Sequence, residues 1–145
     1  AIGSFCLSRG LGDVYKRQGF EWHGDSLNDD LPYFVHFKAG TVVSFSSNME
    51  CNDLPLYMRH GNPPRVMLEI FQDWLDYARK YEQGASRIDP TIHSHVFGRP
   101  VGMSVFQRMI DIAKQADDIW IGTRSEAVKY ILAQQSGTPA RAARG

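Results

Sequence analysis

The sequence predicts an α/β fold, in which short strands alternate with amphipathic helices along 145 residues. Two observations support this prediction. Short runs of β-branched and aromatic residues, such as residues 41–47, have the period of two that is typical of strands. Between them lie longer segments whose apolar residues recur every three or four positions, as on one face of a helix. This order favours parallel strands joined by crossover helices.

Composition excludes several classes of protein and partner. Hydrophobic residues make up 43% of the chain and charged residues 22%, which fits one soluble domain or a piece of a larger one. Lys and Arg number 16 against 16 Asp and Glu and are scattered, so neither nucleic acid nor a membrane is expected as a partner. The two cysteines, Cys6 and Cys51, are too few for a disulfide framework, so a cytoplasmic location is expected.

Residues 1–18 do not follow the α/β pattern. They show no sustained period, and the part that reads CLSRGLGDVYKRQ resembles a translated sequencing adapter found at the ends of gene fragments from environmental DNA. A segment of that kind is excluded from fold prediction, as tags and fusion scars are. We therefore expect residues 1–18 to be non-native and to pack against nothing, and the natural protein to begin upstream. The alternative is an ordinary irregular N-terminal arm.

The region from Gly19 to Asn62 predicts two strands between polar loops. Gly19 to Tyr33 is rich in Gly, Asn and Asp and is expected to be a loop. Phe34 to Phe37 predicts a short strand, and Thr41 to Ser47 a half-buried one in which Val43 and Phe45 alternate with serines. Residues 48–62 form a second polar loop that contains Asn52 and Asp53.

Three helices are expected in the rest of the chain. The first opens at Pro63-Pro64, where φ is already restricted, and has an apolar stripe with an Asp76–Lys80 pair on its wet side. The stripe consists of Met67, Ile70, Phe71, Trp74, Leu75, Ala78 and Tyr81. The second helix begins at Gly102 and Ser104 and turns Phe106, Met109, Ile110 and Ala113 inward. The third follows a capping box formed by Thr123 and Glu126 and runs to about Gln134, before a disordered tail at residues 135–145.

Two further strands are expected between these helices, at Ile88 to Val96 and at Asp118 to Gly122. The first ends in the segment Thr91-Ile-His93-Ser-His95-Val-Phe-Gly98-Arg99-Pro100. Period-two alternation would place His93 and His95 on one face near the carboxyl end of the strand, where α/β proteins carry their chemistry. Histidine suits proton transfer near neutral pH. The alternative is that both histidines are structural or face solvent.

Four blocks of this sequence resemble the C-terminal half of the polysaccharide deacetylase family, carbohydrate esterase family four. The blocks are Trp22-His-Gly-Asp25-Ser-Leu-Asn28-Asp29-Asp30-Leu-Pro32-Tyr33, Asn52-Asp53, Ile92-His93-Ser-His95-Val-Phe-Gly98-Arg99-Pro100-Val-Gly102 and Asp118-Ile-Trp120-Ile-Gly-Thr123-Arg124-Ser-Glu126. Within the family they resemble the branch of allantoinases and peptidoglycan-deacetylase-like proteins. The resemblance covers residues 19–132. It implies that residues 19–134 are the C-terminal portion of a distorted (β/α) barrel, truncated at the N-terminus.

The resemblance also implies a chemistry and a set of site residues. The family hydrolyses carbon–nitrogen amide bonds, usually of N-acetyl groups on sugars, and His93 matches its late histidine, the acid toward the leaving amine. The family's base and metal-binding motifs have no counterpart here, so a divalent metal such as zinc would be held outside this chain. We expect a sugar or other small-molecule substrate, and the oligomeric state, a homo-oligomer included, stays open. The expected substrate-binding residues are His95, Asn28, Asp29, Asp30, Asp53, Arg99 and Trp22.

Three other functions are weighed against a deacetylase. An allantoinase-like cyclic amide hydrolase fits the same branch. A metal-dependent amidohydrolase also uses a His-x-His strand, but it needs later histidines and none follows His95. A carbohydrate-binding or interaction domain without catalysis would leave the histidines structural. For the Asn-Asp clusters, ordinary turn formation is as strong an interpretation as substrate binding.

Overall fold

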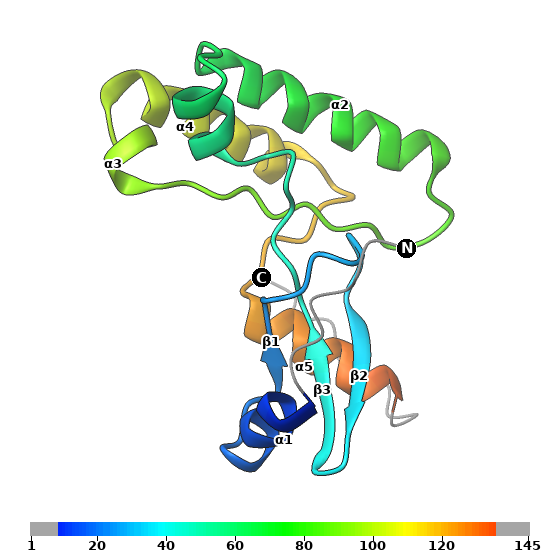
Figure 1. Cartoon of the computed structure of the whole chain (residues 1–145). Helices are drawn as coiled ribbons and strands as arrows, with labels where there is room; N and C mark the ends of the chain where they lie inside the picture. The colour runs from blue at the N-terminus through cyan, green and yellow to red at the C-terminus, as the bar shows by residue number, and fades with distance from the viewer. Residues whose placement is uncertain (1–8, 136–145) are drawn as a thin grey trace. The chain divides into compact units, whose positions relative to one another are not determined.

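The structure is a computed structural model that describes residues 9–135 (Figure 1). The described chain forms two compact units. The first contains the residues up to Ser46 and those from Gly122 onward, and the second contains Ser47–Ile121. Each unit has its own hydrophobic core.

The first unit is built on a three-stranded sheet with the order β1-β3-β2. Its strands are β1 (Trp22–His23), β2 (Tyr33–Phe37) and β3 (Gly40–Ser44). The strands predicted at Phe34 to Phe37 and within Thr41 to Ser47 are therefore confirmed. The loop expected from Gly19 to Tyr33 was wrong at β1, because a two-residue strand is too short to show a period.

The strand directions differ from the all-parallel expectation. β1 and β3 are parallel, but β2 and β3 form an antiparallel hairpin in which Phe37 pairs with Gly40. Gly40 has a φ of 131°, a conformation that favours glycine. A turn this short joins only antiparallel neighbours, and a parallel pair needs a crossover.

Residues 42–46, in strand β3 and just after it, are buried on both faces, so the predicted strand is present but its expected half-buried character is wrong. Helix α5 (Arg124–Gln135) covers one face, where Val128 packs with Val43 and Phe45. Helix α1 (Arg9–Arg17) covers the other face, where the ring of Tyr15 stacks at 6.4 Å from that of His23. The period of two is present in the sequence, but helix α1 covers the face on which the serines were expected to be exposed to solvent.

Helix α1 corrects the expectation that residues 1–18 pack against nothing. Asp13 Oδ1 accepts a hydrogen bond from the Ala39 amide at 2.7 Å, and the Lys16 side chain lies against Gly40. Residues 1–8 lie outside the described part of the chain. The non-native origin of the segment stays a prediction, and the tail expected at 135–145 lies outside the described residues from 136 onward.

The second unit is built on two long helices, α2 (Arg65–Tyr81) and α4 (Pro100–Gln115). The helix predicted after Pro63-Pro64 is confirmed. The second helix is confirmed too, but it begins two residues before Gly102, with Pro100 in its first turn. Short helical segments, η1 (Leu54–Arg59) and α3 (Ser94–Phe97), complete the unit. The core residues contributed by the long helices are Met67, Phe71, Leu75, Val105 and Met109.

Two details of the first long helix were predicted wrongly. Tyr81 is 58% exposed and lies outside the buried stripe. Asp76 lies 3.9 Å from Arg79 and not beside Lys80, whose ammonium sits 4.9 Å from the Tyr81 ring centroid. Arg79 also makes two hydrogen bonds to Asp118, at 2.8 and 2.9 Å. Asp118, far along the chain, folds back to α2 and gives Arg79 this second partner.

The strands expected at Ile88 to Val96 and Asp118 to Gly122 are absent. In the first segment a single parallel bridge joins Thr91 to Asn52, and Ser94 already begins α3. In the second, Trp120 and Ile121 are more than half exposed. An apolar run becomes a strand only where a neighbouring strand pairs with it, and along residues 9–135 neither segment has such a neighbour.

The predicted capping box at the start of α5 is confirmed. The Thr123 hydroxyl accepts a hydrogen bond from the Glu126 amide at 3.2 Å, and Glu126 Oε2 accepts one from the Thr123 amide at 2.7 Å. Within the described chain, no helix combines the length and the apolarity that crossing a bilayer requires.

Candidate functional site

The candidate site is centred on a hydrogen-bonded pair in the second unit, Asp53 and His93. Asp53 is completely buried, and its two carboxylate oxygens both bind His93. Oδ2 accepts from the His93 backbone amide at 2.8 Å, and Oδ1 lies 2.6 Å from His93 Nδ1. A buried carboxylate is tolerated only where donors surround it. The carboxylate thus fixes both the backbone and the ring of one histidine.

This pairing determines which ring nitrogen of His93 is available. A carboxylate can only accept, so Nδ1 carries the proton that points at Asp53. Nε2 is then the nitrogen left for another partner, as an acceptor when the ring is neutral and as a donor when it is cationic. The His93 side chain is 32% exposed, so it is accessible to a small molecule.

Backbone contacts bring the two residues together across 40 positions of sequence. The Thr91 amide donates to the Cys51 carbonyl at 2.9 Å, and the Asp53 amide donates to the Thr91 carbonyl at 3.2 Å. His93 itself has extended dihedrals, φ −96° and ψ 125°, and its carbonyl accepts from the amides of Val96 and Phe97 at the start of α3. His93 therefore lies at the junction of an extended segment and a helix.

The two predicted site histidines are neighbours, but not for the predicted reason. They do not share a strand face, because His95 lies within α3. Their ring centroids are nevertheless 5.7 Å apart, with the planes at 74°. The turn of α3 brings His95 beside His93, and His95 itself is exposed.

His95 and Arg99 line a cavity of about 320 Å³ next to the pair. Its other walls come from η1 through Tyr57 and Met58 and from the first turn of α4 through Val101. Met58 and Val101 are more than 60% exposed, so much of the wall is apolar and open to solvent. The cavity combines two nitrogen-bearing side chains with an apolar rim.

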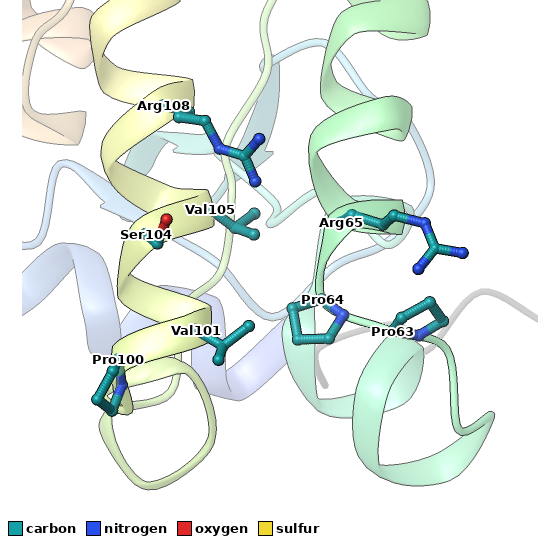
Figure 2. A pocket seen from close by; sticks show the side chains of 8 residues that line it. All are labelled: Pro63, Pro64, Arg65, Pro100, Val101, Ser104, Val105 and Arg108. Carbon is teal, nitrogen blue, oxygen red and sulfur yellow. The ribbon is translucent and has the colours of Figure 1, made fainter.

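A second cavity, of about 380 Å³, lies between the first turns of α2 and α4 (Figure 2). Arg65 stands on the α2 side and Arg108 on the α4 side, and Val105 of α4 points into the gap between the two helices. Arg65 already pairs with Glu69 at 3.7 Å. None of the residues predicted to bind substrate lines this cavity, and we assign it no part in the chemistry of His93.

Four predicted substrate-binding residues lie in the first unit. Asn28, Asp29 and Asp30 are exposed, and Asp29 Oδ1 accepts from the Leu31 amide at 2.9 Å, as a turn-forming aspartate does. Trp22 is half-buried on β1 and not in a loop, with the Arg124 guanidinium 5.6 Å from its ring and Phe45 at its edge. Its packing is that of a wall residue. A role of these four in substrate binding stays a prediction.

Sequence reasoning placed Asp53 in the cleft, and the structure gives it a different position. With no exposed surface, Asp53 cannot contact a substrate in this conformation. Its carboxylate holds the backbone amide and the ring of His93 instead. No local pattern could have shown this, because the partner lies 40 residues away. The apolar cavity residues Tyr57 and Met58 were also missed, since η1 is too short to show a helical period.

The described residues do not form a metal centre. Within residues 9–135 no three side chains of the His, Cys, Asp and Glu types are grouped closely enough to hold an ion. We therefore derive no step through a metal for this chain.

Comparison with known proteins establishes the fold. No protein-family model and no curated protein matches the chain. A probable polysaccharide deacetylase from Pseudomonas aeruginosa PAO1 matches over 90% of this chain and 44% of its own, with a TM-score of 0.75 and 19% identity. The Puue allantoinase matches over 86% of this chain and 42% of its own, with a TM-score of 0.74 and 24% identity.

The fold is shared. Each of these structures is more than twice as long as the part that matches, so the chain spans less than half of either. The likeness agrees with the expected deacetylase-type architecture over the part of each neighbour that this chain covers.

Proposed function

We propose that this chain belongs to a hydrolase of carbon–nitrogen amide bonds, with His93 as the general acid and Asp53 as its positioning residue. The observation that supports this most directly is the buried carboxylate with both oxygens on His93, at 2.6 and 2.8 Å. The fold shared with a polysaccharide deacetylase and an allantoinase agrees with it. A buried carboxylate that holds a partly exposed imidazole is also the arrangement that orients a histidine for proton transfer.

The arrangement suits the last step of amide hydrolysis. Water adds to the carbonyl carbon, and the carbon–nitrogen bond breaks only when the departing nitrogen takes up a proton. Cationic His93 would donate that proton from Nε2 and return to the neutral ring. Asp53 holds Nδ1 and balances the positive charge before the transfer. We assign the activation of water to neither residue.

The substrate contacts proposed for this unit are His95 and Arg99. Both line the cavity beside the pair, and both can donate hydrogen bonds to substrate oxygens. An N-acetylated sugar is the first candidate and an allantoin-like cyclic amide the second. A non-catalytic sugar-binding domain is the alternative of another class, and it would bind without turnover.

The test compares variants of a full-length protein that contains this chain. His93→Ala should lower kcat by about 100-fold to 10,000-fold on the substrate that is turned over, the usual contribution of a positioned general acid. Asp53→Asn should lower it less, because the ring stays but its orientation and counter-charge weaken. His36→Ala is the matched control, since His36 lies exposed on β2 in the first unit and its ring hydrogen-bonds to the Thr41 hydroxyl. N-acetylated sugars and allantoin are assayed in parallel.

The pH profile adds a second readout. An acid catalyst must be protonated, so the rate should fall on the alkaline side in the parent and lose that dependence in His93→Ala. Full activity in a His93→Ala protein with unchanged circular dichroism would contradict the assignment. Binding of a sugar without turnover by the parent would favour the non-catalytic alternative.

A further inference from the structure

The sheet of the first unit has one apolar face and one polar face. Trp22, Phe34 and Val43 point toward α5. In the next register position His23 of β1 pairs with Ser44 of β3, which pairs in turn with Tyr33 of β2. Paired residues point to the same side, so an imidazole, a hydroxyl and a phenol form one row across the sheet.

Two polar atoms of this row are buried without a hydrogen-bond partner among the described residues, His23 Nε2 and Ser44 Oγ. His23 is 6% exposed and Ser44 is 0% exposed. The Asp25 amide donates to His23 Nδ1 at 3.4 Å, so the proton of the neutral ring is on Nε2 and needs an acceptor. Leaving two neighbouring polar groups unpaired in the interior is unfavourable.

The row contrasts with the serine two positions further along the chain. Ser46 is equally buried, but its hydroxyl donates to the Ser26 carbonyl. Tyr33 is also paired, because its hydroxyl lies 2.6 Å from that of Ser26. The unpaired atoms are thus confined to His23 and Ser44, which lie side by side.

We propose that His23 and Ser44 form a binding site for a neutral oxygen group, an amide carbonyl or a sugar hydroxyl, and that Tyr15 of α1 covers it. An oxygen acceptor would take the Nε2 proton and exchange a hydrogen bond with the Ser44 hydroxyl. Burial lowers the pKa of His23, with a smaller opposing effect from Asp25, so the ring is neutral and an anion gains no charge partner there. The choice of an amide as the ligand rests on the proposed function.

The Tyr15 side chain that covers the proposed site is held by weak contacts. The Tyr15 ring stacks on His23 with a centroid distance of 6.4 Å, and its hydroxyl donates to Asp25 Oδ2 at 3.3 Å, near the surface. In β/α barrels ligands bind at the carboxyl ends of the parallel strands, where the connecting loops begin. His23 and Ser44 are the last residues of the parallel strands β1 and β3, which agrees with a ligand-facing role.

The first experiment measures whether the buried hydroxyl of Ser44 lowers the stability of the folded chain. Ser44→Ala should leave the melting temperature unchanged or raise it, because it removes an unpaired buried hydroxyl. Ser46→Ala is the matched control, and it should lower the melting temperature by about 2 to 8 °C through loss of a made hydrogen bond. A fall in Ser44→Ala equal to that in Ser46→Ala would overturn the proposal, since it would mean that a bound water already satisfies the hydroxyl.

The second experiment measures binding directly on this chain. Acetamide is titrated while the His23 ring resonances are followed by NMR, with acetate as the anionic comparison. We expect acetamide, but not acetate, to shift the Nε2 resonance, and Tyr15→Ala to strengthen binding several-fold, while Tyr77→Ala, at an exposed tyrosine of α2, should not. No shift with acetamide in Tyr15→Ala, or equal binding of acetate, would overturn the proposal. Neither result depends on turnover at His93, so the proposed function is tested separately.

Discussion

Gly102 lies in the first turn of α4 and packs against Phe97, the last residue of α3, the segment that carries His95. A Cβ at this position would stand 2.6 Å from Phe97 Cα and 2.9 Å from its ring. Gly84, between α2 and the His93 segment, has nothing within 4 Å of the same atom. The two glycines therefore differ in packing, and the difference can be measured.

Gly102→Ala should destabilise the chain by about 1–3 kcal/mol in urea denaturation, the usual cost of overpacking. The sign is informative, because alanine in an open helical position would instead stabilise by up to about 1 kcal/mol. Gly84→Ala is the control and should change stability by less than about 0.5 kcal/mol. Equal effects of the two substitutions would mean that α3 and α4 are not in close contact.

Cys51 is a buried thiol next to the Asp53 segment. Burial raises its pKa to about 12, with a smaller effect from Glu50. Because only the thiolate reacts, the Cys51 thiol in a Cys6→Ser chain should react with a disulfide reagent at pH 8 slower than free cysteine by a factor on the order of a thousand. Guanidinium should restore the ordinary rate. Rapid reaction of the native chain would mean that this part of the core opens readily.

At the scale of single elements, the capping box fixes the start of α5. Glu126 has a lowered pKa, mainly because it accepts the Thr123 amide and also its hydroxyl. A depressed carboxyl pKa contributes stability that is present above the unfolded value and is lost as pH falls through the folded value. The contribution should therefore disappear as pH falls below about 4.5, the ordinary glutamate value.

Two substitutions test this. Thr123→Ala should cost about 1 kcal/mol at pH 7, as loss of an N-cap does, whereas Ser125→Ala on the exposed side of the first turn should cost less. Glu126→Gln should destabilise at pH 7, and the difference from the parent should shrink as pH falls below about 4.5 and the parent carboxyl takes up its proton. Thermal melts across this pH range give both values. A pH-independent difference between Glu126→Gln and the parent would exclude the carboxylate as the cause.

At the scale of the whole molecule, large apolar side chains remain exposed on both units. Each is at least 40% exposed, and they include Phe20, Leu27, Leu31, Met49, Met58, Val101, Trp120 and Ile121. In addition, β1 and β2 are the two edges of the sheet. Exposed apolar surface and unpaired edges both favour association.

The isolated chain should therefore bind a hydrophobic dye and associate in a concentration-dependent way, which light scattering and dye fluorescence would detect. Lys or Glu at Met58 and Val101 should reduce both signals. A monodisperse monomer with a sharp cooperative melt and no dye binding would contradict this prediction.

The sequence alone predicted the long helices and the strands β2 and β3. For α2, α4 and α5 the prediction rests on apolar spacing, a proline at the start or a capping box, and these act within a few residues of one another. The hairpin of β2 and β3 is local as well, since Ala39 and Gly40 turn the chain back on itself. His93 was also singled out from its block of sequence, and its catalytic role stays a prediction.

Tertiary structure decided which polar groups meet. Residues 88–96 and 118–122 would become strands only if another segment of the chain paired with them. Their own composition does not show whether such a segment is present. The same holds for Asp53 and His93, and for His23 and Ser44, which are joined by contacts across 40 and 21 positions. Periodicity and capping are properties of neighbours in sequence, whereas a buried polar group takes whichever partner the folded chain brings to it.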